Sequence, residues 1–269
     1  MKVAVVGHTG MGGSALTEVL LSRGHTVTGI SRTAGARADR AGLTHVSGDI
    51  FDIAGLTEAI RDHDVVVSTF CGGHEVDLSV YYRQVEGTRR LLAAFQRANG
   101  SYLIYVGGAA SLFVASGLQM FDDPRFPEWY FGMLPPAHLR WLGEITGKEF
   151  FHEAAKRKED GVVAPGRTDP ELAANVKSFT RVPLLEGCRA ALELMAGRSH
   201  FRWSFLSPPW QYRPGEATGG YRLGVDYLIF ENGVPSGIAV PDLALALADE
   251  VENQAFVHKH WTVAGSMPD

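Results

Sequence analysis

The chain has 269 residues, 45% of them hydrophobic and 20% charged, with a formal net charge of −5 at pH 7. This length is near the upper limit for one hydrophobic core, and the negative charge argues against a general nucleic-acid surface. The two cysteines, Cys71 and Cys188, lack metal-ligand spacing, and no apolar run approaches the roughly 18 residues of a membrane helix. With no signal-peptide pattern at the N-terminus, we expect a cytoplasmic protein that meets neither nucleic acid nor membrane and holds no metal.

The first half of the chain alternates between short apolar strands and amphipathic helices. Strands are predicted at Val3–Val6, His25–Ile30, Thr44–Ser47, Val65–Thr69 and Tyr102–Val106, and helices at Ser14–Arg23, Ala54–Arg61 and Ser79–Arg97. Continuous apolar strands separated by helices are typical of a parallel sheet that is covered on both faces. The sequence therefore predicts an α/β protein with a doubly wound parallel sheet.

The second half is less regular. Residues 111–142 are rich in aromatic residues and prolines and follow neither the helical nor the strand period. Beyond them we predict helices at Ile145–Arg157, Leu184–Met195 and Pro241–Val251, strands at Arg202–Leu206 and Phe256–Val263, and an exposed loop at Lys158–Pro170.

The segment VVGHTGMGG joins the first strand to the first helix and spaces Gly7, Gly10 and Gly13 as G-x-x-G-x-x-G. The first glycine permits a tight turn, the second lets backbone approach a pyrophosphate, and the third lets helix and strand pack closely. Amides at the helix N-terminus then face the phosphates. Because strand, turn, helix and second strand follow in the required order, the sequence predicts a dinucleotide site. Its residues here are Gly7, Thr9, Gly10, Met11, Gly12 and Gly13.

The end of the second strand indicates which dinucleotide binds. A site for NAD usually holds an acidic residue about 20 residues after the glycines, to bind the ribose 2′-hydroxyl. This chain has Ser31 and Arg32 there, followed by Arg37 and Arg40. A guanidinium pairs well with a 2′-phosphate, and no carboxylate stands there to repel it. The sequence therefore favours NADP(H) as the cofactor.

Further cofactor contacts are predicted at the carboxyl ends of the later strands, where open α/β sheets bind ligands. An acidic and an apolar residue after the third strand would border the adenine. Small residues after the fourth strand let the cofactor pass close to backbone, and glycines after the fifth lie beside the nicotinamide. These predicted contacts are Asp49, Ile50, Thr69, Cys71, Gly72, Gly107 and Gly108.

Together these segments resemble the atypical short-chain dehydrogenase/reductases, and most closely their NAD(P)H-binding, NmrA-like group, which includes flavin and biliverdin reductases. The matching pieces are VVGHTGMGG, SR at Arg32, GDIFD, VGGAASL, WSFLSPPW, GEATGGYRLG and the terminal PDLALALADEVEN. The resemblance implies a Rossmann fold, NAD(P)H and hydride transfer, and it leaves the substrate open. It covers both ends of the chain, whereas the stretch Phe113–Arg198 matches poorly.

One departure from the family concerns the proton donor. The wider superfamily uses a Tyr-x-x-x-Lys pair, and no tyrosine of this sequence is followed four residues later by lysine. The family's serine position corresponds to Ser111. Histidines of the central stretch are alternative donors, because histidine gives up a proton near neutral pH without special tuning. The catalytic candidates are Ser111, His138, His152 and Tyr130, with Lys148 and Glu186 as further titratable residues; each also has a purely structural interpretation.

Aromatic residues of the irregular stretch, with two from the segment after it, are predicted to line a pocket for a flat or hydrophobic substrate. Packing into a core is the alternative interpretation. The predicted wall consists of Trp129, Tyr130, Trp141, Trp210 and Tyr212. Two histidines, His258 and His260, share one face of the last predicted strand. Without a third ligand they are interpreted as a polar strand face rather than a metal site.

We therefore divide the chain into a dinucleotide-binding core (1–111), a variable substrate-covering insertion (112–200) and a segment that completes the core and the substrate pocket (201–269). The leading hypothesis is an NADPH-dependent reductase acting on a hydrophobic or aromatic carbonyl, enone, quinone or flavin-like acceptor. The alternatives are a non-enzymatic NADP-binding regulator of the NmrA type and a non-redox isomerase, cyclase or dehydratase. A small molecule is the expected partner, and a homodimer is left open.

Overall fold

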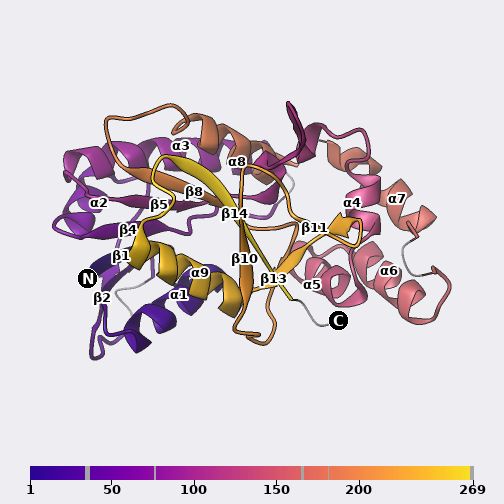
Figure 1. Ribbon diagram of the computed structural model, residues 1–269, viewed down its shortest axis with the longest axis horizontal. Helices are drawn as coiled ribbons and strands as arrows, with labels where there is room; N and C mark the ends of the chain where they lie inside the picture. The colour runs from indigo at the N-terminus through magenta and orange to yellow at the C-terminus, as the bar shows by residue number, and fades with distance from the viewer. Residues whose placement is uncertain (34–36, 76, 165–166, 181, 267–269) are drawn as a thin grey trace.

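The computed structural model describes residues 1–33, 37–75, 77–164, 167–180 and 182–266, and one large sheet runs through it (Figure 1). The strands of this sheet are β1 (Lys2–Val6), β2 (Thr26–Ser31), β3 (Leu43–Ser47), β4 (Val65–Ser68), β5 (Leu103–Val106), β8 (Trp203–Ser207), β9 (Gln211–Arg213), β10 (Tyr221–Val225), β13 (Gly237–Ala239) and β14 (Lys259–Gly265). Their order is β3-β2-β1-β4-β5-β8-β14-β13-β9, with β10 paired to β14. From β3 to β14 all neighbours are parallel, whereas β10 and β13 run antiparallel to β14. The predicted doubly wound parallel sheet is confirmed.

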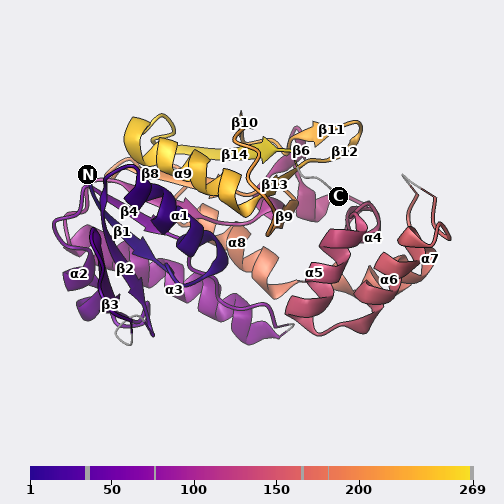
Figure 2. The ribbon, with the colours of Figure 1, turned by 90° about the horizontal axis from the view of Figure 1, so that it is seen from below.

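Helices cover both faces of the sheet (Figure 2). One face packs against α1 (Met11–Ser22) and α9 (Val240–Asn253), which contribute leucines to a core with the odd-numbered residues of β1. The other face packs against α2 (Ile53–Ile60), α3 (Leu78–Arg97) and α8 (Pro183–Glu193), in a second core. Because both faces are buried, strands such as β4 consist entirely of buried side chains.

Beyond the carboxyl ends of the central strands lies a third layer, here called the helical cap (residues 128–176). It consists of α4 (Glu128–Gly132), α5 (Pro136–Thr146), α6 (Glu149–Glu159) and α7 (Pro170–Val176). The 3₁₀ turns η2 (Ala109–Ser111), η3 (Met120–Asp122) and η4 (Lys177–Thr180) and the hairpins β6 (Phe113–Ala115)–β7 (Leu118–Gln119) and β11 (Phe230–Glu231)–β12 (Val234–Pro235) flank it. A core of its own, built from both aromatic and aliphatic side chains, holds this layer together.

The structure corrects the predicted elements of the irregular half. The single helix predicted at Ile145–Arg157 is two helices, because α5 ends at Thr146 and its C-cap, Gly147, adopts a left-handed φ of 64°. Helix α5 also begins earlier, at a proline in its first turn, within the stretch that showed no period. In the predicted loop Lys158–Pro170, residues 165–166 lie outside the described residues, and Asp169 is buried as the N-cap of α7.

Candidate active site

Glycines hold the turn between β1 and α1 tightly against the end of β4. Gly7 has a φ of 86°, and a Cβ there would lie 2.9 Å from Oγ1 and 3.1 Å from the carbonyl carbon of Thr69. A Cβ on Gly13 would lie 2.4 Å from the Gly7 carbonyl oxygen, so only glycine lets α1 pack so closely. At Gly10 the nearest atom to such a Cβ is the Gly7 oxygen, at 3.3 Å. The backbone at Gly10 is therefore the part of the turn that a ligand can approach.

The N-terminus of α1 is left free to bind an anion. Its N-cap residue, Gly10, makes no side-chain capping hydrogen bond, and the first turn holds no acidic residue. The first N–H groups of a helix lack intrahelical acceptors and carry partial positive charge. The pyrophosphate of a dinucleotide therefore fits the turn as the structure presents it.

The predicted adenosine contacts flank this turn. The amide of Gly7 donates to the Ile30 carbonyl at 2.8 Å, which places the end of β2 beside the turn. Ser31 ends that strand and Arg32 is exposed directly after it. Asp49 is likewise exposed, and its carboxylate accepts a hydrogen bond from the amide of Phe51 at 2.9 Å. Ile50 is buried in the core between the sheet and α2 and α3.

The sequence did not single out His8, which follows Gly7. Its ring is buried, and its Nε2 lies 2.9 Å from Nδ1 of His45 on β3. Burial is the main cause that lowers the pKa of His8, and the neighbouring His45 and Arg37 add to it. The neutral ring fills the space above Gly29, where a Cβ would lie 2.5 Å from it.

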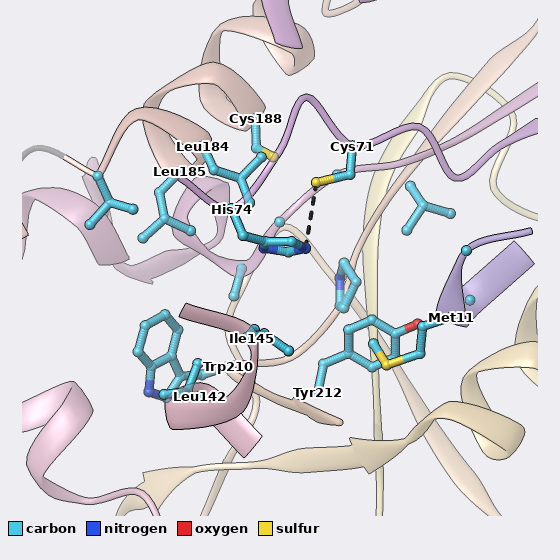
Figure 3. Close-up of a pocket in the computed structure, with 18 of the residues that line it drawn as sticks. Met11, Cys71, His74, Leu142, Ile145, Leu184, Leu185, Cys188, Trp210 and Tyr212 are labelled. Atoms are coloured by element: carbon cyan, nitrogen blue, oxygen red, sulfur yellow. Dashed lines mark hydrogen bonds between the residues drawn. The ribbon is translucent and has the colours of Figure 1, made fainter. Parts of the chain in front are cut away.

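A cavity of about 680 Å³ connects the glycine turn with the helical cap (Figure 3). At one end it is lined by the turn, by the segment after β4 and by the segment after β5. At the other end, α5 and α8 contribute mostly apolar side chains. Figure 3 shows Met11 and Tyr212 on one side of it, with Trp210, Leu142 and Ile145 around the other end.

The cavity brings together about half of the predicted site. The predicted residues on its wall are Gly10, Met11, Gly12, Thr69, Cys71, Gly107, Gly108, His138, Trp141, Trp210 and Tyr212. Tyr212 reaches from β9 to the glycine turn, since a Cβ on Gly12 would lie 2.7 Å from its hydroxyl oxygen. Burial raises the pKa of this tyrosine. Of the predicted substrate wall, three of the five aromatic residues therefore face the space that a substrate can enter.

Trp129 and Tyr130 are not on that wall. Tyr130 is fully buried, and its hydroxyl donates a hydrogen bond of 2.9 Å to the carboxylate of Asp123. Burial and this carboxylate raise the pKa of Tyr130. The ring of Trp129 lies beneath the guanidinium of Arg125, 4.4 Å from the ring centre. For these two residues the structure favours the alternative interpretation, packing in the core of the cap.

Two other catalytic candidates also lie off the cavity wall. The ring of His152 packs against α5, where a Cβ on Gly143 would lie 2.4 Å from its Nε2. Ser111 is fully buried, and its hydroxyl donates to the Gly108 carbonyl at 2.8 Å. Ser111 is thus one hydrogen bond away from a residue that lines the cavity.

His138 is on the wall, but its charge state differs from the expected one. The side chain is 3% exposed, and its Nδ1 has no hydrogen-bond partner among the described residues. Burial, with a smaller effect from the charge of Arg213, lowers the pKa of His138 to about 3. The ring is therefore neutral at neutral pH, and the expectation of a histidine that donates without tuning does not hold here. A neutral imidazole can still hydrogen-bond a polar atom of a substrate.

The sequence reasoning missed His74, which lies on the wall beside Cys71. The sulfur of Cys71 is 3.8 Å from Nε2 of His74 (Figure 3). Both side chains are exposed to solvent, and the desolvation that they do experience raises the pKa of the Cys71 thiol and lowers that of His74. The pair therefore lacks the thiolate character of an activated cysteine. In the sequence, His74 follows Cys71 with two glycines between them, shortly after the predicted strand Val65–Thr69. That position is the signal that could have identified His74.

The loop after β4 is fixed by Gln84 of α3. The Gln84 side-chain oxygen accepts from the amide of Gly72 at 2.7 Å, and its nitrogen donates to the hydroxyl of Tyr105 at 2.8 Å. A Cβ on Gly72 would lie 2.8 Å from the backbone nitrogen of Gln84. Gly72, a predicted cofactor contact, therefore lets the loop lie directly on α3.

Comparison with known proteins supports the interpretation of this site. Residues 7–133 match the family model described as NAD(P)H-binding. The uncharacterised protein YwnB of Bacillus subtilis is 26% identical over 268 residues, 98% of each chain. Among the described residues, no helix is long and apolar enough to span a membrane.

Two solved structures share the fold over almost their full length. One, from Bacteroides thetaiotaomicron, is described as a "putative epimerase"; it is 22% identical, with a TM-score of 0.72, over 100% of this chain and 98% of that one. The other, from Streptococcus pneumoniae, is described as a "putative NADH-flavin reductase"; it is 21% identical, with a TM-score of 0.68, over 99% of this chain and 100% of that one. The comparisons thus show a Rossmann-type fold for the chain, and residues 7–133 of it match the NAD(P)H-binding family model.

Proposed function

We propose that the protein is an NADPH-dependent reductase of a flat, hydrophobic acceptor such as an enone, a quinone or a flavin-like ring system. The observation that carries this proposal is the cavity of about 680 Å³, which extends from the cofactor turn to the helical cap. A volume of this size suits a small organic ligand. A protein that only senses the cofactor has no need of an apolar cavity that extends beyond the cofactor turn.

The glycine turn and the N-terminus of α1 hold the pyrophosphate, and the glycines after β5 lie where the nicotinamide is expected. Bound there, the cofactor supplies a hydride. Arg32 is exposed directly after β2, and in this proposal its guanidinium pairs with the 2′-phosphate of the phosphorylated cofactor. The protein's own contribution is to bind the acceptor, exclude water and supply a proton.

The acceptor is held in the apolar half of the cavity. Trp141, Trp210, Leu142 and Ile145 offer aromatic and aliphatic surface, while His138 offers a neutral polar ring. A planar conjugated molecule matches this lining. Within its group, the protein falls with the flavin and biliverdin reductases in this proposal, acting in the cytoplasm; a homodimer is compatible with it.

The proposal is tested by following NADPH absorbance in the presence of menadione, benzylideneacetone or flavin mononucleotide. We expect turnover with at least one of the three and none in the Gly10→Val variant, whose added side chain occupies the pyrophosphate site. Calorimetric titration of NADPH without acceptor is the accompanying measurement. Tight NADPH binding with no turnover of any acceptor would instead favour the regulator or a non-redox enzyme.

A further inference from the structure

Gly12 is the one glycine of the turn that the dinucleotide motif does not require. The G-x-x-G-x-x-G spacing uses the glycines at positions 7, 10 and 13, and it leaves position 12 open to other residues. Glycine is also less favourable than alanine in a helix. A Cβ on Gly12 would lie 2.7 Å from the hydroxyl oxygen of Tyr212 and 3.9 Å from the ring carbon that carries this hydroxyl. Outside the helix itself, no other described residue comes within 4 Å of that Cβ. The hydroxyl of Tyr212 therefore accounts for the glycine.

Tyr212 is held in this position by its strand and by the core. It is the middle residue of β9 and lies opposite Ile238 of β13 in the sheet. The side-chain amide of the preceding residue, Gln211, donates to the carbonyl of Pro235 at 3.0 Å. The tyrosine ring packs against the core between the sheet and α1 and α9. The place of the hydroxyl therefore follows from the fold.

The Tyr212 hydroxyl is a donor that the protein does not use. It makes no hydrogen bond to the part of the chain that the structure describes. Burial raises the pKa of Tyr212, so the hydroxyl keeps its hydrogen at neutral pH. Figure 3 shows the side chain on the wall of the cavity, with its oxygen directed toward the Met11 end of α1. The hydrogen is therefore available to a molecule bound there.

The first turn of α1 offers further unused donors at the same place. The amides at positions 10 and 14 donate to backbone carbonyls, each at 2.9 Å. Between them, the amides of Met11, Gly12 and Gly13 have no backbone acceptor among the described residues. The Tyr212 hydroxyl lies beside the middle one of these three residues. Four donors from two distant segments therefore gather at the end of the helix, where an anion is favoured.

Resting on the dinucleotide site of the function proposed above, we propose that Tyr212 binds the cofactor, its hydroxyl donating a hydrogen bond to a pyrophosphate oxygen of NADPH. The phosphate oxygens carry negative charge, and a hydrogen bond to a charged acceptor is stronger than one between neutral groups. Position 12 is a glycine because the hydroxyl occupies the space of a side chain. The segment 201–269 thereby contributes to the cofactor site as well as to the substrate pocket.

This assignment separates Tyr212 from proton transfer. Its hydroxyl lies at the first turn of α1, whereas the nicotinamide is expected beside Gly107 and Gly108, after β5. The ring still lines the cavity, as the sequence predicted for the substrate wall. Loss of the hydroxyl should therefore weaken NADPH binding and leave kcat at saturating NADPH near that of the wild type.

The contact is tested with Tyr212→Phe, which keeps the ring and its packing. We expect the NADPH dissociation constant, measured by calorimetry, to rise about tenfold, at the low end for loss of a hydrogen bond to a charged group. Adenosine 2′-monophosphate, which has the 2′-phosphate but no pyrophosphate, should bind the variant and the wild type equally. Tyr227→Phe is the matched control, because it removes the hydroxyl of an exposed tyrosine that does not line the cavity.

A double-mutant cycle tests the pairing of the hydroxyl with Gly12. Gly12→Ala adds a Cβ that displaces the hydroxyl, so NADPH affinity should again fall about tenfold. In the Tyr212→Phe background the same alanine should cost little more, since the nearest ring carbon is 3.9 Å from its Cβ. Losses that multiply in the double variant would show that the two positions act separately and would overturn the pairing.

The outcomes distinguish this contact from the proposed function. A Tyr212→Phe variant that binds NADPH as tightly as the wild type, or that shows only a raised KM for the acceptor, would overturn the contact and leave the reductase standing. A parallel loss of affinity for adenosine 2′-monophosphate would overturn it by assigning the hydroxyl a structural role. Failure of every acceptor would remove the reductase, while a tenfold difference in NADPH affinity would still support the contact. A wild type that binds no NADPH would overturn both.

Discussion

The two ends of the cavity are built by opposite means. At the cofactor end, backbone shapes the site: glycines at 7, 10 and 13 let a turn, a helix and a strand end approach within van der Waals contact. At the cap end, side chains shape it: short helices of 5 to 11 residues are held by aromatic packing around Phe131 and Trp210. The difference teaches that one fold combines an end whose form is fixed by backbone with an end whose form depends on the choice of side chains.

The largest effect is expected from Tyr130→Ala, and it is an effect on the stability of the cap end. Removing a fully buried ring from the core of the cap should lower the free energy of unfolding by about 3–5 kcal/mol. Because Tyr130 does not line the cavity that reaches the glycine turn, the NADPH dissociation constant of the folded fraction should not change. Urea denaturation and calorimetry measure the two quantities. A parallel loss of NADPH affinity would show that the two ends are not separate.

Gly10→Val should weaken NADPH binding and leave the fold intact, which is the reverse of the effect expected from Tyr130→Ala. A Cβ at this position meets only the Gly7 oxygen, at 3.3 Å, so the fold should survive. The branched side chain blocks the pyrophosphate, and NADPH affinity should fall more than 100-fold, about 2.7 kcal/mol. Ser14→Val, an exposed change in the same turn of α1, is the control and should bind normally. Near-normal binding by Gly10→Val would place the phosphates elsewhere.

Arg32→Glu should change the choice of cofactor rather than its binding as a whole. Loss of one charge-assisted contact to a 2′-phosphate costs about 1.5–3 kcal/mol, so NADPH affinity should fall while NADH affinity changes little. Arg40→Glu serves as the control, because that arginine pairs with Glu18 on the surface. Equal losses for both cofactors, measured by calorimetry, would contradict the assignment of Arg32.

The smallest expected effect is on the pH dependence of protein stability, through His138 at the cap end. The pKa of His138 is about 3 in the folded protein against an ordinary 6.5, so the unfolded chain takes up the proton first as pH falls. Stability should therefore be lost progressively below pH 6.5, by about 1–2 kcal/mol between pH 7 and pH 5 from this residue. His138→Leu should lose correspondingly less over that range in urea denaturation, with the titration of His260 common to both proteins. An unchanged pH dependence would mean that the ring is not held neutral.

The sequence predicted the strands, the glycine turn and the first helix at the cofactor end because the determinants of these elements are local. Short runs of β-branched residues such as Val65–Val67 favour buried strands, and the glycine spacing specifies a backbone shape without reference to the rest of the chain. The cap was not predictable in the same way. Its helices are short, and α5 begins at a proline and is capped by Gly147. The helical spacing of apolar residues therefore extends over too few turns to be recognised in the sequence.

The chemistry was harder to predict than the fold, because it depends on contacts between distant segments. Trp129 and Trp141 look equivalent in the sequence, yet one lies under Arg125 and the other lines the cavity. Gly12 and Tyr212 lie in opposite halves of the chain and meet only because β9 carries the tyrosine to the first turn of α1. Neither relation has a signature in residue type or spacing.

The division between the two ends is tested most directly by Trp141→Ala, with Trp129→Ala as its matched control. Trp141 lines the acceptor half of the cavity, so its loss should raise KM for menadione about tenfold, equivalent to 1.4 kcal/mol, with the NADPH dissociation constant unchanged. Trp129→Ala should leave both constants near those of the wild type. If Trp141→Ala instead weakened NADPH binding in step with KM, or changed neither, the cavity would not be the place where cofactor and acceptor meet.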